Sequence, residues 1–199
     1  YQTKPYFCKG LHQLLFDLKQ LGRQRRQRRT QQSRRKPQER RTQQPRRTSQ
    51  IRRNTMKLVI QRVERANVKV DGKTAGEIGV GLLVLAGIGS QDSEADCERL
   101  AAKLVNLRIF SDGEGKTNLS IKDVGGELLV ISQFTLYADC RKGNRPNFLL
   151  AKEPDEAQRL YEYFTELCRS YIPVVRTGVF GAEMKVELLN DGPFTIILE

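Results

Sequence analysis

Two short polar motifs contain the side chains of this sequence that are best suited to chemistry. Residues 132–135 (Ser-Gln-Phe-Thr) place two hydroxyls and an amide directly after the apolar run 128–131. Polar groups at the end of a rigid element suit a small-molecule site. They indicate a pocket for a polar carbonyl compound, with Thr135 as nucleophile or as hydrogen-bond donor. Simple polarity at the edge of a sheet is the alternative explanation.

The second motif is residues 190–195 (Asn-Asp-Gly-Pro-Phe-Thr). This composition predicts a turn, and glycine before proline relieves the steric limits on that position, where a cis bond is tolerated. An ordinary β-turn is the simpler interpretation.

A basic loop, 141–148, carries Arg141, Lys142 and Arg145 beside Phe148, and suits either phosphate groups or solvent. Residues 87–90 precede a helix but lack the third glycine and the lysine of a phosphate-binding loop.

The histidine and cysteine content excludes several mechanisms. His12 is the only histidine, so residues 56–199 offer no imidazole for a Ser-His-Asp triad, a Cys-His pair or a His-ligated metal. The cysteines, at positions 8, 97, 140 and 168, form neither a CxxC motif nor a disulfide framework, which indicates reduced thiols. We therefore expect no metal and no cofactor. No apolar run is long enough to cross a membrane.

The elements that must position these motifs predict an α+β fold. Apolar runs and alternation indicate strands at 57–63, 66–70, 81–89, 108–110, 128–135, 174–177, 184–189 and 194–198, with turns at 71–72, 76–79 and 112–115. On the strand through 128–135, Gln133 and Thr135 would share one face. Helices are expected after the cap residue Ser93 and from Pro154 to about Tyr171. We predict curved, mainly antiparallel, barrel-like sheets with two helices.

The charge divides the chain into two parts. Residues 1–55 hold 17 of the 35 Lys and Arg residues and 2 of the 23 Asp and Glu residues, a charge of +15, which leaves −3 for residues 56–199. We expect this Arg- and Gln-rich extension to be disordered, because it has too few apolar residues to build a core. It is a nucleic-acid-binding arm, an organelle-targeting segment, or sequence outside the working protein, since the first Met is Met56.

Residues 56–199 resemble D-aminoacyl-tRNA deacylase, the D-tyrosyl-tRNA(Tyr) deacylase family. The resemblance is carried by 56–63 (MKLVIQRV), 81–85, 105–110, 125–139 (GGELLVISQFTLYAD), 178–186 and 190–195. Both family signatures, Ser-Gln-x-Thr and Asn-x-Gly-Pro-x-Thr, are intact and in order. Nothing in residues 1–55 resembles the family.

The resemblance implies a homodimeric, cytoplasmic hydrolase that proofreads chirality in translation. Such an enzyme cleaves the ester between a D-amino acid and the 3′-terminal adenosine of tRNA, at two sites on the subunit interface. Ser132, Gln133 and Thr135 would line the site. The pair Gly192-Pro193, in the cis form, would reach into the partner's pocket, where its backbone carbonyls exclude an L side chain. Clearance of glycyl-tRNA mischarged on tRNA-Ala is a further activity that the resemblance leaves open.

The remaining site residues follow from the same resemblance. Thr195 would lie near the pocket, Phe134 and Met184 would pack around it, and Arg62 would hold the Gly-Pro loop. For Thr135 we favour a donor role over a nucleophilic one, because no base is present, and the ribose 2′-hydroxyl of the substrate could activate water. The tRNA end would be bound through backbone and stacking contacts without sequence readout.

The sequence leaves three alternative functions. A related deacylase that edits L-alanyl-tRNA or glycyl-tRNA would replace the serine of Ser-Gln-x-Thr and hold the Gly-Pro pair trans, so Ser132 argues against it. A non-catalytic nucleic-acid-binding protein would use the basic extension instead of Thr135. A threonine-dependent amidohydrolase is the third.

Overall fold

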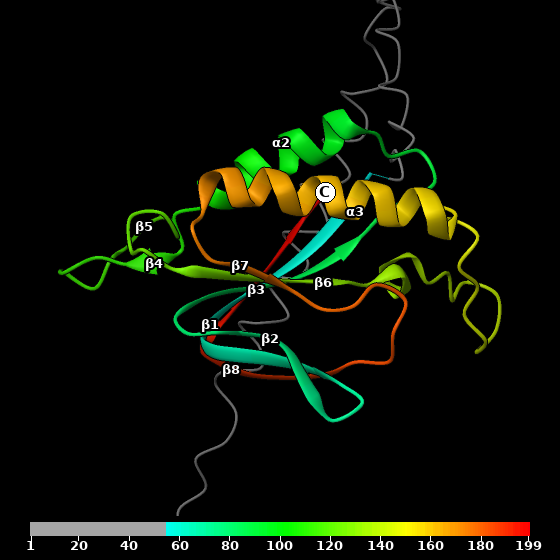
Figure 1. Ribbon diagram of the computed structural model, residues 1–199. Helices are drawn as coiled ribbons and strands as arrows, with labels where there is room; N and C mark the ends of the chain where they lie inside the picture. Colours follow the sequence, from blue (N-terminus) through cyan, green and yellow to red (C-terminus); the bar gives the residue numbers. More distant parts are fainter. Residues whose placement is uncertain (1–54) are drawn as a thin grey trace, which may run out of the picture. The chain divides into compact units, whose positions relative to one another are not determined.

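The computed structural model describes residues 55–199, which are the coloured ribbon of Figure 1. The expectations for the N-terminal extension concern residues 1–54 and lie outside the described range. Along the chain the elements are β1 (Lys57–Val70), β2 (Lys73–Ile78), β3 (Gly81–Gly87), α2 (Glu94–Val105), β4 (Phe110–Ser111), β5 (Thr117–Leu119), β6 (Glu127–Ser132), the 3-10 turn η1 (Phe134–Tyr137), α3 (Pro154–Tyr171), β7 (Val175–Thr177) and β8 (Lys185–Leu198). The predicted α+β class with two helices is confirmed.

β1 is the strand on which the sheet is built. One of its edges pairs antiparallel with β3 over 57–63 and with β2 over 66–70. Its other edge pairs antiparallel with β8 from Leu58 to Lys69. β6 adds to β3 and β7 adds to β6, both in parallel. Antiparallel pairs are the majority, as predicted, whereas the parallel pairs were not predicted.

The sheet curls until its end strands nearly meet. The strand order is β2-β1-β3-β6-β7, with β8 on the other edge of β1. A Cβ atom at Gly76 in β2 would lie 2.9 Å from the backbone oxygen of Thr177 in β7. Such a close approach of two backbones requires glycine. The result is the nearly closed, barrel-like sheet that was expected.

Both faces of the central strands are buried. Figure 1 shows α2 and α3 side by side on one face of the sheet. Against the helices pack alternate residues of β3 and β6: Leu82, Val84, Leu128 and Val130. The residues between them, Leu83, Leu129 and Ile131, join Val63 and Val68 in a second cluster inside the curve of the sheet. Two-sided burial explains why β3 and β6 are continuous apolar runs.

The helix predictions are confirmed. α2 follows Ser93, whose hydroxyl and backbone nitrogen bond to Asp96 in a capping box. α3 starts at Pro154 and ends at Tyr171. Leu100 and Leu104 of α2 and Leu160 and Phe164 of α3 are at most 1 % exposed. No helix within residues 55–199 has the length and apolar character needed to cross a bilayer.

Four strand and turn predictions were wrong in detail. Of the strand expected at 108–110, only Phe110 lies in a strand, β4. The two strands expected at 57–63 and 66–70 are one continuous strand, β1, because β8 pairs with it along nearly its whole length. The turn expected at 76–79 is largely inside β2, where Gly76 serves the approach to β7 rather than a turn. The two strands expected at 184–189 and 194–198 are one strand, β8, which a bulge interrupts.

The parallel pairing of β3 with β6 leaves no room for a side chain at residue 81, so this position must be glycine. A Cβ atom there would lie 1.9 Å from the backbone oxygen of Glu127, its partner in the sheet. We expect Gly81→Ala to lower the free energy of unfolding by about 2–3 kcal/mol, because the strands must separate. Gly113→Ala, in a turn with nothing within 4 Å of the added atom, should change it by less than about 0.5 kcal/mol. Equal losses in urea unfolding would contradict this account of the β3–β6 pair.

Candidate active site

The first polar motif marks the end of β6 and not a strand face. β6 stops at Ser132, and η1 begins at Phe134. The backbone nitrogen of Gln133 still donates to Ala86 O (2.8 Å), after which the chain turns. The prediction that Gln133 and Thr135 share one face of a strand is therefore wrong, since the hydrogen bonds to β3 end at Gln133 and η1 begins at the next residue.

The turn nevertheless brings the two polar side chains together. Gln133 Nε2 donates to Thr135 Oγ1 over 2.5 Å. The threonine hydroxyl, having accepted this bond, still has its own hydrogen to donate. Thr135 is exposed and Gln133 is half-buried, so the donor faces solvent from a fixed turn. An oriented hydroxyl of this kind can stabilise negative charge that develops on an oxygen.

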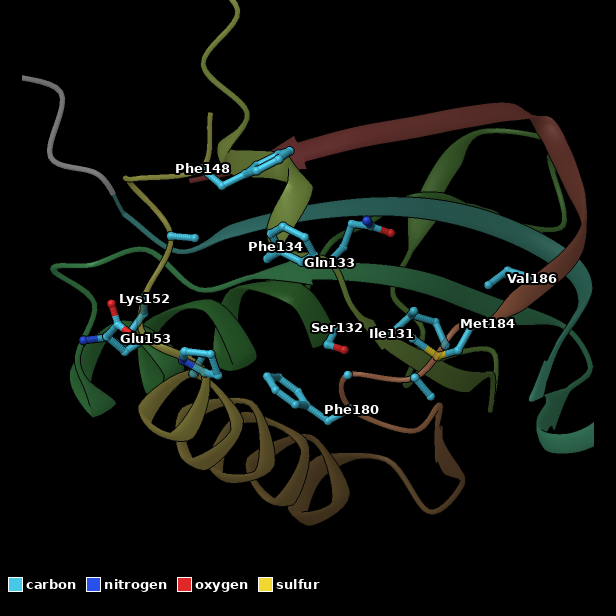
Figure 2. A pocket seen from close by; sticks show the side chains of 15 residues that line it. Ile131, Ser132, Gln133, Phe134, Phe148, Lys152, Glu153, Phe180, Met184 and Val186 are labelled. Atoms are coloured by element: carbon cyan, nitrogen blue, oxygen red, sulfur yellow. The ribbon is translucent and has the colours of Figure 1, made fainter. Parts of the chain in front are cut away.

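A pocket of about 570 Å³ opens beside this turn (Figure 2). Three segments line it: the end of β6 with the start of η1, the approach to α3, and the segment before β8. The lining residues are Ile131, Ser132, Gln133, Phe134, Phe148, Ala151, Lys152, Glu153, Pro154, Ala157, Phe180, Gly181, Ala182, Met184 and Val186. Its volume is typical of a small-molecule site.

The pocket is aromatic and apolar with a few polar groups. Phe134 and Phe148 meet edge to face with ring centroids 5.0 Å apart. In Figure 2, Ser132 lies between Phe134 and Phe180, and Lys152 and Glu153 lie together on another side. An apolar wall with few polar groups suits a planar ring that carries polar substituents. Within residues 55–199, no three His, Cys, Asp or Glu side chains gather where they could ligate a metal ion.

The second motif is a bulge in β8 rather than a free turn. Thr195 pairs with Gln61 and Asn190 pairs with Val63, so the four residues between them oppose Arg62 alone. The Asn190 Oδ1 atom accepts the backbone N–H of Phe194 (2.7 Å), which closes the bulge. The peptide bond between Gly192 and Pro193 is cis, the isomer that the resemblance implied.

Arg62 holds this bulge from the neighbouring strand. Its Nε donates to Asp191 O (3.2 Å) and lies 2.9 Å from the Asp191 carboxylate. Its Nη1 donates to Ile109 O (2.6 Å), and its Cζ lies 5.0 Å from the ring centroid of Phe194. Arg62 is only 9 % exposed, and a buried guanidinium is tolerated only with such partners.

A single chain does not unite the two groups of predicted site residues. Ser132, Gln133, Phe134 and Met184 line one pocket, with Thr135 hydrogen-bonded at its edge. None of Arg62, Gly192, Pro193 and Thr195 lines that pocket. Thr195 instead receives a hydrogen bond from Gln61 Nε2 (3.4 Å).

Sequence reasoning missed part of the pocket wall. Phe180, Lys152 and Glu153 line it, and none was predicted as a site residue. Their place in the sequence could have indicated them, since Lys152 and Glu153 directly precede the predicted helix start at Pro154.

In the basic loop, Arg141 is bonded by two of its nitrogens to Asp139 (2.8 and 2.6 Å) and so is not a free cation. This pairing holds the pKa of Asp139 well below its usual range.

Comparisons with known proteins agree with one another. The sequence pattern of the family described as D-Tyr-tRNA(Tyr) deacylase matches residues 59–199. D-aminoacyl-tRNA deacylase of Dehalococcoides mccartyi is 59 % identical over 144 residues, which are 72 % of this chain and 94 % of that protein. The enzyme of the same name from Thermosipho africanus is 55 % identical, over 72 % and 97 % of the two chains.

Solved structures show the same fold. The structure titled "c-Myc DNA Unwinding Element Binding Protein" superposes with a TM-score of 0.69 at 44 % identity, over 72 % of this chain and 97 % of that one. A structure described as a probable eukaryotic D-amino acid tRNA deacylase has a TM-score of 0.63 at 19 % identity, over 72 % and 98 % of the chains. The second likeness concerns the fold alone.

The bulge depends on the Arg62 guanidinium. We expect Arg62→Gln to lower the free energy of unfolding by about 2–4 kcal/mol, because buried partners lose a charged donor. Arg65→Gln changes an exposed arginine of the same strand and should cost less than about 0.5 kcal/mol. Chemical denaturation of both variants measures the difference, and similar losses would mean that Arg62 does not hold the bulge.

Proposed function

The chain belongs to the D-Tyr-tRNA(Tyr) deacylase family and is a hydrolase of D-aminoacyl-tRNA, and we propose that Ser132, Gln133 and Thr135 form its reaction centre. The observation that carries this proposal is the hydrogen bond from Gln133 Nε2 to Thr135 Oγ1. It directs the hydroxyl hydrogen of Thr135 away from Gln133, toward a bound carbonyl oxygen.

In the proposed reaction, water attacks the carbonyl carbon of the ester. The bond between this carbon and the ribose 3′-oxygen breaks, the 3′-oxygen takes a proton, and the products are free D-amino acid and tRNA. Thr135 donates to the carbonyl oxygen while it carries negative charge. Residues 56–199 hold no histidine, so the ribose 2′-hydroxyl of the substrate assists the attacking water.

The pocket is proposed to take the 3′-terminal nucleoside. Its Phe134 and Phe148 rings offer apolar surface to a base, and Ser132 and Gln133 offer hydrogen bonds to polar atoms near the ester. Met184 and Phe180 close the other wall. Such contacts involve the terminal adenosine that all tRNAs share, so they suit an enzyme that serves many tRNAs.

Chiral selection is proposed to come from the β8 bulge of a second subunit. Gly192 and Pro193 are exposed, although Arg62 and Asn190 hold the bulge rigidly. A rigid, exposed backbone that does not line the pocket beside η1 in its own chain is suited to enter the same pocket of a partner. There its carbonyl groups would occupy the space of an L side chain. Glycine has no side chain to exclude, so glycyl-tRNA should also be cleaved.

The proposal requires that the protein is a homodimer. β8 pairs with β1 along one edge, and no other strand within residues 55–199 pairs with β8. Leu188 and Leu189 (38 % and 39 % exposed) and Ile197 (64 % exposed) lie along this strand. Exposed aliphatic residues on an edge strand are suited to contact a second copy. Since the substrate belongs to translation, we place the enzyme in the cytoplasm.

A second candidate function is nucleic-acid binding by residues 1–55. Its support is the charge of +15 in that segment. That segment lies almost wholly outside the described residues. Binding of this kind would not depend on Thr135, which separates it from the deacylase reaction.

The proposal is tested by following hydrolysis of D-tyrosyl-tRNA and L-tyrosyl-tRNA by the 199-residue chain. We expect release from the D substrate alone. Thr135→Ala should lower kcat about 10²- to 10³-fold with little change in KM, as for loss of one oxyanion donor. Thr135→Ser should retain most activity, and Thr117→Ala, an exposed threonine of β5, should retain all of it. Full activity of Thr135→Ala, or equal release from both substrates, would refute the assignment.

The phosphates of the tRNA end are expected to contact Lys142 and Arg145. Both are exposed in the loop that leads to Phe148, whereas Arg141 is paired with Asp139. If each neutralises one phosphate, the double variant Lys142→Gln, Arg145→Gln should flatten the slope of log KM against log salt by about 1.4. Lys103→Gln with Lys122→Gln makes the same charge change at exposed sites elsewhere. If log KM depends on log salt with the same slope in the two double variants, the loop does not contact the tRNA.

A further inference from the structure

A buried carboxylate lies behind the turn that carries Thr135. Asp92, in the loop between β3 and α2, is 5 % exposed, and Tyr137, the last residue of η1, is 3 % exposed. The Tyr137 hydroxyl donates to Thr55 O (2.6 Å) and lies 3.4 Å from Asp92 Oδ2. Neither side chain lines the pocket, so the reaction proposed above does not use them.

Asp92 joins three parts of the chain. It accepts the backbone N–H of Gly89 in its own loop and that of Met56 at the start of β1, and its third neighbour is Tyr137. The same loop bonds to the segment before α3, through Ser90 N to Leu150 O (2.9 Å) and Lys152 N to Ile88 O (3.0 Å). The loop therefore touches η1 on one side and a wall of the pocket on the other.

The turn itself is packed on β3 and β1. A Cβ atom at Gly87 would lie 3.0 Å from Gln133 O and 3.2 Å from the Tyr137 ring. Lys57 Nζ lies 5.1 Å from the centroid of that ring and donates to Leu136 O (3.4 Å). Tyr137 thus has a cation on its ring and hydrogen-bond partners at its hydroxyl, so the C-terminal end of η1 is fixed.

The surroundings of Asp92 leave its charge uncompensated. The groups that act on this charge within the described residues are the backbone of Gly89 and Met56, the Tyr137 hydroxyl and the Asp96 carboxylate of α2, and none is a cation. Cys97 of α2 also faces it, while Lys57 is paired with Glu199 (3.8 Å). Burial raises the pKa of Asp92 to about 6, and Asp96 adds to this effect.

We propose that Asp92 and Tyr137 are positioning residues that hold η1 so that Thr135 stays aligned with Gln133 and the bound ester. The inference rests on the role proposed for Thr135. Ionised Asp92 accepts the backbone N–H groups of Gly89 and Met56, while the Tyr137 hydroxyl gives its one hydrogen to Thr55 O and packs against Asp92 Oδ2. A proton on Asp92 occupies one of these accepting oxygens, so the contact that this oxygen makes with the backbone or with Tyr137 changes. The turn then relaxes, and the donor at Thr135 leaves its place.

Tyr137→Phe keeps the ring and removes only the hydroxyl. We expect kcat for D-tyrosyl-tRNA to fall about 10-fold with KM unchanged, since small misplacements of a reacting group slow the chemical step. Asp92→Asn should do the same. The control is Tyr161→Phe, which removes an equally buried hydroxyl that donates to Val130 O (2.7 Å) of β6 and not to the loop of Asp92 or the start of β1. It should lose stability but keep its kcat. Unchanged kcat in Tyr137→Phe would overturn the proposal.

The pH profile separates positioning from general stability. The kcat of the wild type should fall as pH drops below about 6, and this limb should be missing in Asp92→Asn. The stability of the fold should depend on pH in the opposite direction from kcat. The folded state holds the Asp92 proton more tightly than the unfolded chain, whose pKa is about 3.9, so the contribution to stability falls as pH rises from about 4 to 6. The difference between the Tm of Asp92→Asn and the Tm of the wild type should therefore shift in favour of the variant as pH rises from about 4 to 6.

Failure of the two proposals can be told apart. If the wild type does not cleave D-tyrosyl-tRNA, or Thr135→Ala keeps full activity, the proposed function fails and this inference falls with it. If Thr135 behaves as proposed but Asp92→Asn retains the limb near pH 6, the assignment of Asp92 alone is overturned.

Discussion

The guanidinium of Arg62 sets the condition on which the rest of the site depends. A buried cation is costly unless each of its donors is used, and here Asp191, Ile109 and the ring of Phe194 meet it from three directions. This arrangement lets four residues of β8 leave the sheet opposite a single residue of β1 without becoming a loose loop. A rigid backbone projection is what exclusion of one enantiomer would need, because a mobile loop would yield to the wrong substrate.

One strand positions both motifs. β1 supplies Arg62 to the bulge, Gln61 to Thr195 and Lys57 to the carbonyl of Leu136 in η1. The turn η1 lies on β3, the neighbour of β1 on one edge, and the bulge lies in β8, its neighbour on the other. The two motifs therefore have a common support, although the residues of the bulge do not line the pocket beside η1. In the proposed dimer, each subunit would offer a pocket and a bulge whose relative placement β1 fixes.

Much of this could be predicted from local sequence, and the failures have physical causes. Ser93 and Pro154 mark helix starts through their own chemistry, so both helices were placed correctly. The end of β6 was misplaced because the change to η1 depends on where pairing with β3 ends, and Gln133 and Thr135 gave no local sign of it. The bulge was predicted as a turn because only the register with β1 shows that the strand resumes. Asp92 was overlooked since its burial depends on Met56 and Tyr137, distant in sequence.

The central claim is that the bulge of one subunit completes the pocket of the other. Gly192→Ala would crowd Arg62 Nη2 (3.2 Å) and Phe194 N (3.1 Å), displace the bulge, and so admit L-tyrosyl-tRNA. The decisive measurement co-assembles this variant with an excess of Thr135→Ala, so that each active pocket faces an intact bulge. We predict that L-tyrosyl-tRNA hydrolysis disappears while D-tyrosyl-tRNA hydrolysis persists. If hydrolysis of the L substrate per active pocket stays unchanged, the bulge acts within its own chain and the account is contradicted.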